Sequence, residues 1–199
     1  MQQRKKQPAV TRQAILDAAG GEFSRHGYCG TGIGAIVEAA GLTKGALFHH
    51  FPDKRALAAA WIGENLREAH RRTWIEPLEA IRSLDGFRAF CRARCLEMLP
   101  GDAASALVSL AAETAAEDSV LAEAFGGVFE AWRQAIATLI ERGVAGGWIY
   151  RSIQPATEAA FLVSTFSGFT VIAKTSPDES MRRICATALE GYLETLRPQ

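Results

Sequence analysis

The stretch TGIGAIVEAAGLTKGALFHHFPDKRAL, residues 31–57, decides how this chain folds. Ile33, Ile36 and Val37 recur at the spacing of an amphipathic helix, and a glycine follows at Gly41. The pattern predicts a short helix that ends just before this glycine. We expect Thr31, at the start of the stretch, to cap that helix.

A second short helix is predicted after only two residues. Thr43 is placed to cap it, Leu47 and Phe51 face inward, and Pro52 stops it. Two short helices joined by a glycine-containing turn form a helix-turn-helix candidate. The second helix offers a hydroxyl, an ammonium, a glycine and two imidazoles, groups that suit the major groove of DNA. A three-helix packing unit with an incidental polar face would have the same spacing.

The remainder of the sequence also shows helical periodicity, with no long alternation typical of strands. We expect a first helix capped by Thr11 and ended by Gly27, and a long helix from Asp53 to about Thr73. The later helices are expected at residues 84–98, 103–116, 119–145, 155–174 and 178–196. The prediction is an all-α protein of about nine helices. A three-helix helix-turn-helix domain would occupy residues 1–56, with a basic arm at 1–9, and a helical bundle residues 57–199.

Charge is distributed unevenly along the 199 residues. The chain carries 22 Lys+Arg and 22 Asp+Glu, yet residues 1–56 hold eight of the bases and only four of the acids. A basic head on an otherwise acidic chain predicts a polyanionic partner for the head alone. With 48% apolar and 22% charged residues, the composition is typical of a globular protein rather than a disordered one.

Other compositional features exclude several classes of protein. The four cysteines, Cys29, Cys91, Cys95 and Cys185, form no CxxC pair, so we expect reduced, buried thiols and no metal site. The most apolar stretch, residues 159–173, is shorter than the roughly 18 to 20 residues that cross a bilayer. No secretory signal is visible. These observations predict a cytoplasmic protein that does not interact with membranes.

Residues 31–57, together with Thr11–Leu16, Phe23 and Gly27–Tyr28 upstream, resemble the signature of the TetR/AcrR family of bacterial repressors. The resemblance covers about a quarter of the chain. It implies a three-helix DNA-binding domain that a long fourth helix links to a dimerising, effector-binding domain. The positions that match the family's DNA contacts and flanking residues are Thr31, Ile33, Thr43, Lys44, Gly45, Phe48, His49, His50 and Lys54.

Details of this match give finer expectations. Phe48 stands where many members have tyrosine, so a phenol contact to phosphate is missing. We expect His49 to face DNA, His50 to be partly packed, and Lys54 to contact a phosphate. The arm Arg4-Lys5-Lys6 is also expected to contact phosphates.

Aromatic residues in the second half of the chain predict a bundle core, part of which would line an effector pocket. The pocket is expected to be mostly apolar, with few polar groups. Its candidate residues are Phe90, Ser109, Glu113, Glu117, Phe125, Phe129, Trp132, Phe166 and Phe169.

The last two helices carry more apolar surface than one bundle buries, which predicts a two-fold homodimer. Candidate interface residues are Phe161, Ser164, Gly168, Cys185, Leu189, Tyr192 and Leu193. Two heads on one axis would read a palindromic operator in double-stranded DNA.

The sequence therefore favours a ligand-controlled repressor. A constitutive DNA-binding dimer without an effector would differ only in lacking a pocket. An all-helical enzyme is the third hypothesis, but no nucleophile–base pairing or phosphate loop supports catalysis, and no cofactor motif is present.

Overall fold

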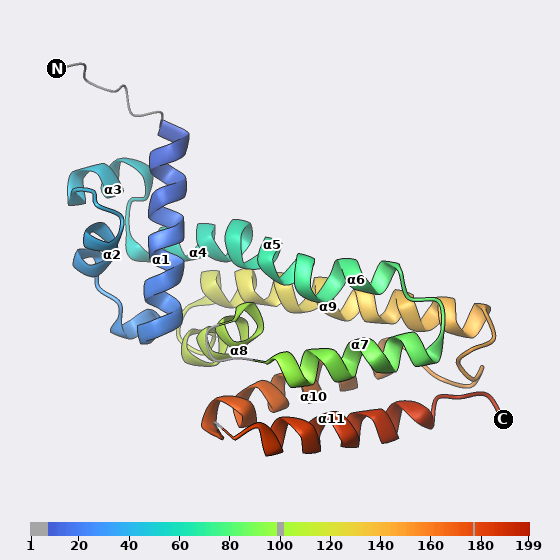
Figure 1. The fold of residues 1–199 in the computed structure, drawn as a ribbon. Coiled ribbons are helices and arrows are strands. Elements are labelled where there is room, and N and C mark those ends of the chain that lie inside the picture. The colour runs from blue at the N-terminus through green and yellow to red at the C-terminus, as the bar shows by residue number, and fades with distance from the viewer. Residues whose placement is uncertain (1–7, 99–101, 177) are drawn as a thin grey trace. The chain divides into compact units, whose positions relative to one another are not determined.

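The structure, a computed structural model, describes residues 8–98, 102–176 and 178–199. The described residues form helices, turns and bends, and none lies in a strand, as the sequence predicts (Figure 1). The helices are α1 Pro8–Gly30, α2 Ile33–Ala39, α3 Lys44–His50, α4 Lys54–Trp61, α5 Arg67–His70, α6 Glu76–Glu79, α7 Leu84–Glu97, α8 Ala103–Thr114, α9 Ser119–Ala145, α10 Pro155–Thr175 and α11 Glu179–Glu194, with π-helical turns η1 Ile62–Leu66 and η2 Arg71–Ile75.

The run from Lys54 to Glu79 is helical without a break, because η1 and η2 join α4, α5 and α6 end to end. Counted as one helix, it brings the described total to the expected nine. Asp53 caps the run by accepting a hydrogen bond from the Ala56 amide at 2.7 Å, as its sequence position suggests. The helix extends beyond the expected end at Thr73.

The described chain divides into two compact units. Unit 1 holds the residues up to Glu68 together with Ser109–Phe125, and unit 2 holds Ala69–Val108 and Gly126–Gln199. The expected boundary after residue 56 thus falls inside unit 1, because the start of the long helix and part of α8 pack with the N-terminal helices. The expected basic arm falls mostly outside the described residues.

In unit 1, α1 packs through a buried stripe at Ile15, Leu16, Ala19 and Phe23. Thr11 lies inside the first turn of α1, which is described from Pro8 onward, so the expected cap at Thr11 is wrong. Proline suits the first turn of a helix, where its missing N–H costs nothing.

Two glycines in α1 have separate structural reasons. A Cβ on Gly20 would lie 2.2 Å from Nε1 of Trp61, so only glycine lets the indole approach this closely. Gly27 has φ of 75° and breaks the helical path where the sequence predicted the helix to end. The next residues continue in one further turn.

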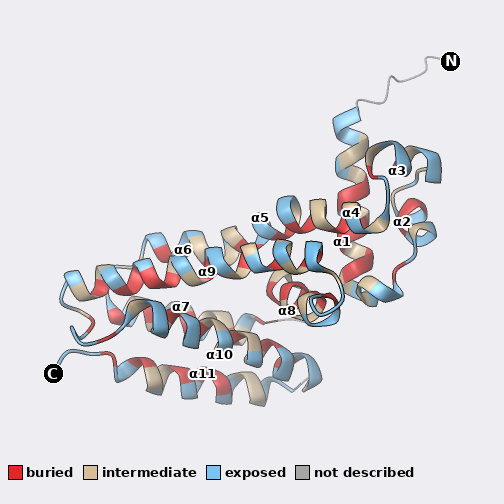
Figure 2. Ribbon diagram, turned by 180° about the vertical axis from the view of Figure 1, so that it is seen from behind, coloured by how far each residue is buried: buried red, intermediate tan, exposed pale blue. Residues whose placement is uncertain are grey.

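Unit 2 is built around α7 and α11, which pack along their lengths. Buried residues alternate with exposed ones along α11, as expected for an amphipathic helix (Figure 2). Cys91, Cys95 and Cys185 are buried, whereas Cys29 in unit 1 is exposed, so the expectation of four buried thiols is wrong for that one.

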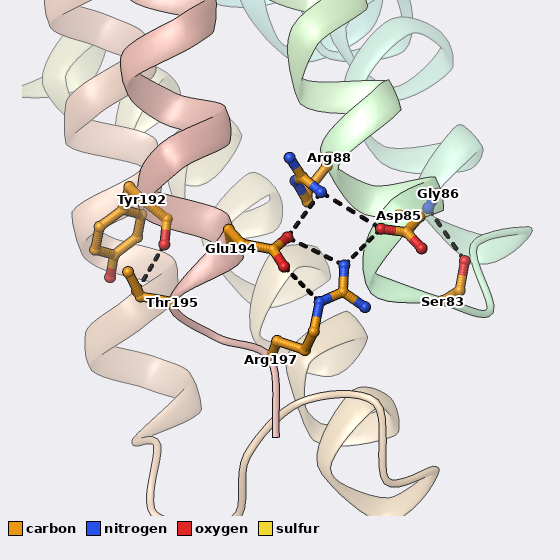
Figure 3. Close-up of polar contacts among 8 residues, drawn as sticks. All are labelled: Ser83, Asp85, Gly86, Arg88, Tyr192, Glu194, Thr195 and Arg197. Carbon is orange, nitrogen blue, oxygen red and sulfur yellow. Dashed lines mark hydrogen bonds and ion pairs between the residues drawn. The ribbon is translucent and has the colours of Figure 1, made fainter. Parts of the chain in front are cut away.

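Ion pairs join the start of α7 to the end of α11 (Figure 3). Arg197 binds Asp85 at 2.7 Å and Glu194 at 2.6 Å, and Arg88 binds Glu194 at 2.7 Å. Hydrogen bonds from Arg197 lower the pKa values of both carboxyls below their usual range. Ser83 caps α7 beside this group through the amide of Gly86, at 3.1 Å.

Helix α10 has 21 residues and is longer than the apolar stretch seen in the sequence. By length and composition alone it could cross a membrane, although one such helix is weak support for a span because core helices share this property. Ala159, Leu162, Phe166 and Ala173 form its buried face.

Candidate functional site

The helix-turn-helix candidate forms in unit 1 as predicted. Gly41 adopts φ of 62° between α2 and α3, and the Leu42 amide donates to the Val37 carbonyl at 2.9 Å. Ile36 and Leu47 are fully buried beneath the turn. The turn and this shared core fix how α3 is presented.

Helix α3 presents one outward face. Thr43 caps it by accepting a hydrogen bond from the Ala46 amide at 3.2 Å, as predicted. Lys44, Gly45, Phe48 and His49 are exposed at helical spacing, whereas His50 is half-buried as expected. The large apolar ring of Phe48 remains 47% exposed. The ammonium of Lys44, the imidazole of His49 and the ring of Phe48 surround Gly45, which has no side chain. Such a surface can contact base edges in a DNA groove.

Thr31 and Lys54 have internal roles that the sequence did not reveal. Thr31 is 2% exposed and donates to the Gly27 carbonyl at 2.7 Å, and Gly32 rather than Thr31 occupies the N-cap of α2. The ammonium of Lys54 donates to the carbonyls of Tyr28 and Thr31, both at 3.0 Å. It also lies 4.4 Å from the centre of the Tyr28 ring. Both side chains thus brace the turn between α1 and α2, and their contact with DNA stays a prediction. Ile33 is half-buried at the start of α2.

Arg12 fastens α1 to the long helix. Its guanidinium makes two 2.6 Å hydrogen bonds to Glu64 and lies 5.1 Å from the centre of the Phe51 ring. The hydrogen bond from Arg12 lowers the pKa of Glu64. Arg12 was counted among the basic residues of the N-terminal segment, but its charge is paired with that of Glu64.

Glu113 holds the turn that follows the Gly27 break, and sequence reasoning missed this role. Its two carboxylate oxygens accept the amides of Tyr28 at 2.9 Å and Cys29 at 2.6 Å. Partial burial opposes ionisation, but these backbone hydrogen bonds outweigh it, and the pKa of Glu113 is lowered. Both carboxylate oxygens of Glu113 are thus engaged within unit 1, and its place in an effector pocket stays a prediction. Glu117, one turn later, is exposed.

The other effector candidates are divided between the two units. Ser109 and Phe125 belong to unit 1, where Phe125 lines a cavity of about 10 Å³ beside Phe23 and Trp61. A cavity of that size holds about one water. The remaining candidates belong to unit 2, and they are Phe90, Phe129, Trp132, Phe166 and Phe169.

The aromatic core of unit 2 is tightly packed. Trp132 and Phe166 are each 1% exposed, and both rings contact Trp74, with centroids 4.8 Å and 4.9 Å from its own. Phe90, Phe129 and Phe169 are half-buried at the edge of this core. An open groove of about 320 Å³ runs elsewhere in unit 2, between Ile75 and Leu78 on one side and Ala135 and Thr138 on the other.

The interface candidates divide into two groups. Phe161, Ser164 and Gly168 are exposed on α10, and Tyr192 is half-buried against Phe161, with ring centroids 4.7 Å apart. Cys185, Leu189 and Leu193 are at most 7% exposed and pack inside unit 2. These three side chains therefore present little surface to a partner, and their place at an interface stays a prediction.

Within the described ranges, no group of three or more His, Cys, Asp or Glu residues is arranged to hold a metal ion.

Comparisons with known proteins agree with this geometry. The model of the bacterial regulatory proteins of the tetR family matches residues 15–61. The HTH-type transcriptional regulator LmrA of Bacillus subtilis is 31% identical over 128 residues, which are 61% of this chain and 66% of LmrA. The A-factor receptor protein of Streptomyces griseus is 28% identical over 171 residues, which are 82% of this chain and 55% of the receptor. The alignments thus span between about half and two thirds of these relatives.

Solved structures share the fold over nearly the whole chain. Reduced NemR of E. coli has a TM-score of 0.81 at 18% identity, covering 95% of this chain and 97% of NemR. Salmonella enterica GusR has a TM-score of 0.74 at 26% identity, covering 98% and 99%. With its helix-turn-helix, its all-helical architecture and these relatives, the chain belongs to the TetR family of bacterial transcriptional regulators.

Proposed function

We propose that this chain is a ligand-responsive repressor of the cytoplasm that binds a palindromic operator as a homodimer and is released by a small-molecule effector. The observation that carries the proposal is the outward face of α3. Lys44, Phe48 and His49 project from a helix whose opposite side is locked into unit 1 by Leu47. A rigid helix with a free cation and imidazole provides the positioning that base readout requires.

Dimerisation is supported by the outer surface of the last two helices. Phe161, Val171 and Ile184 are between 47% and 60% exposed, an unusual exposure for large apolar side chains. Gly168 and Gly191 are exposed among them and would allow close helix approach. A pair of heads on a two-fold axis would provide the affinity for a palindrome that one small head lacks.

Control by an effector is supported by one relative, the A-factor receptor protein of Streptomyces griseus, whose name describes a receptor. Tight packing around Trp132 and Phe166 favours the second candidate, a constitutive repressor without an effector. A thermal-shift screen of the free protein against small apolar and aromatic compounds separates the two. A compound that stabilises the protein and also weakens operator binding supports the first.

The DNA-binding proposal is tested with an operator selected by the parent protein from random duplexes. In fluorescence anisotropy, Lys44→Ala and His49→Ala should each weaken operator binding by about tenfold or more, as expected for lost base or phosphate contacts. Arg151→Ala is the matched control, since it removes one exposed positive charge from unit 2. If both α3 variants bind like the parent while retaining its circular dichroism, the assignment of α3 as the recognition helix is wrong.

A further inference from the structure

One histidine in unit 2 is buried without any polar partner. His70 is 0% exposed, and both of its ring nitrogens lack a hydrogen bond among the residues that the structure describes. Burial lowers its pKa to about 4, so the imidazole is neutral near pH 7. A neutral imidazole has one hydrogen-bond donor and one acceptor, and neither forms a hydrogen bond here. Buried polar groups are rarely left this way, because each unmade bond costs stability.

Aromatic rings surround this imidazole. Trp74 stacks on it, with centroids 6.1 Å apart and planes within 13°, and Trp132 meets it edge-on at 4.8 Å. His70 is the last residue of α5. The π-helical turn η1 ends directly before α5, and η2, which carries Trp74, begins directly after it. Such π-helical turns are rare and are frequent at functional sites. A polar imidazole is therefore enclosed between aromatic rings of the long helix and of α9.

A row of aromatic contacts links this centre to the partly buried edge of the core. Trp74 contacts Phe90 at right angles, with centroids 6.3 Å apart, and Phe90 is only partly buried. The guanidinium of Arg94, one turn later on α7, lies 5.8 Å from the centre of the Phe90 ring. Nε of Arg94 is buried and has no hydrogen-bond partner among the described residues, although Nη2 of the same guanidinium pairs with Glu97. A second buried donor without a hydrogen bond, Nε of Arg94, thus lies at the outer end of the same row of rings.

We propose that His70 and Arg94 are the inner and outer polar anchors of an effector site for planar aromatic hydroxy acids. The proposal rests on the effector-controlled function above and specifies its ligand class. The ligand ring takes the place of the Phe90 ring against Trp74, its hydroxyl bonds to the imidazole, and its carboxylate bonds to the Arg94 guanidinium. In the free protein the Phe90 ring occupies this place. The ligand displaces it because the ligand supplies hydrogen-bond partners to the His70 ring nitrogens and the Arg94 guanidinium, which the free protein leaves without them.

Two matched probe pairs test this on the full chain by calorimetry: para-hydroxybenzoate against benzoate, and a hydroxynaphthoate against the naphthoate that lacks the hydroxyl. In at least one pair, the hydroxylated acid should bind the parent about tenfold more tightly, as one additional hydrogen bond to a buried group provides. His70→Phe keeps a flat ring and removes both nitrogens, so it should abolish that preference while leaving operator binding unchanged. Arg94→Gln should weaken both members of the pair and leave their ratio unchanged. His26→Phe, at an exposed histidine of unit 1, is the control and should alter neither.

Each other outcome overturns the inference. Equal affinity within both pairs, no binding of any probe, or a preference that survives His70→Phe refutes the role of His70. Failure of the broader function is recognised separately. If other compounds release the operator and these acids do not bind, the repressor model stands and the ligand class is wrong. If the acids bind through His70 but never weaken operator binding, the site exists and its effector role is refuted.

Discussion

The carboxylate of Glu113 should stabilise unit 1 through its two backbone hydrogen bonds, and Glu113→Gln tests this. The amide retains one acceptor oxygen but places an NH2 group opposite the second backbone N–H, so one charge-assisted bond is lost and two donors meet. A buried hydrogen bond to a charged group contributes about 1.5–3 kcal/mol. Because this carboxylate is partly exposed, solvent screening reduces the expected loss to about 1 kcal/mol. For a chain of this size that corresponds to a fall in Tm of about 2–4 °C.

The pH dependence gives a second measurement of the same interaction. The folded-state pKa of Glu113 is lowered below its unfolded value, so its contribution is fully present above the unfolded pKa and is lost as pH falls through the folded pKa. Urea unfolding of parent and variant should therefore differ at pH 7 and converge in acid. Glu117→Gln, one helical turn away and exposed, is the matched control and should have little effect at either pH. Equal destabilisation by the two variants, or a difference at pH 7 that persists in acid, would refute the reasoning.

Two further predictions concern the proposed interface and the α1 packing. Ile184 is 60% exposed, so Ile184→Lys should give monomers of near-parent stability with weak operator binding. Leu193 is 0% exposed, so Leu193→Ala should instead lower the free energy of unfolding by about 2–5 kcal/mol. Sedimentation and urea unfolding distinguish the two effects, and a dimeric Ile184→Lys protein would contradict the interface. Gly20→Ala should lower the free energy of unfolding by about 1–2 kcal/mol, because its Cβ overlaps Trp61 by more than helix propensity can offset. Gly21→Ala meets only the flexible end of Arg25 and should be neutral or stabilising, so equal effects of the two alanines in thermal unfolding would contradict the packing argument.

Local signals in the sequence predicted the helices and part of the candidate site. Thr43 and Asp53 cap their helices as expected, since each side chain bonds an amide three residues ahead and needs nothing from the rest of the fold. Thr31 offered the same signal but bonds backward to Gly27. Local pattern alone does not decide between these two partners.

Long-range contacts could not be predicted from the pattern. Glu113 and Tyr28 are 85 positions apart, and nothing near either residue indicates the other. The two faces of α11 were also indistinguishable in sequence, because apolar residues occur on both. In the structure Leu189 is buried in the core of unit 2, whereas Ile184 is 60% exposed. Periodicity identifies an apolar stripe but not the surface that covers it.

The π turns explain the phase of the long helix. Its buried side chains recur at every fourth position, from Ala58 through Ile62, Leu66, His70 and Trp74 to Leu78. In an unbroken α-helix, a four-residue repeat drifts by about 40° each time, or about 200° over these five repeats. Each π turn absorbs about one extra residue, and two of them cancel that drift. Deleting a single residue inside η2 would therefore rotate every later side chain of the helix by about 100°, carrying Leu78 out of the core without altering its neighbours in sequence.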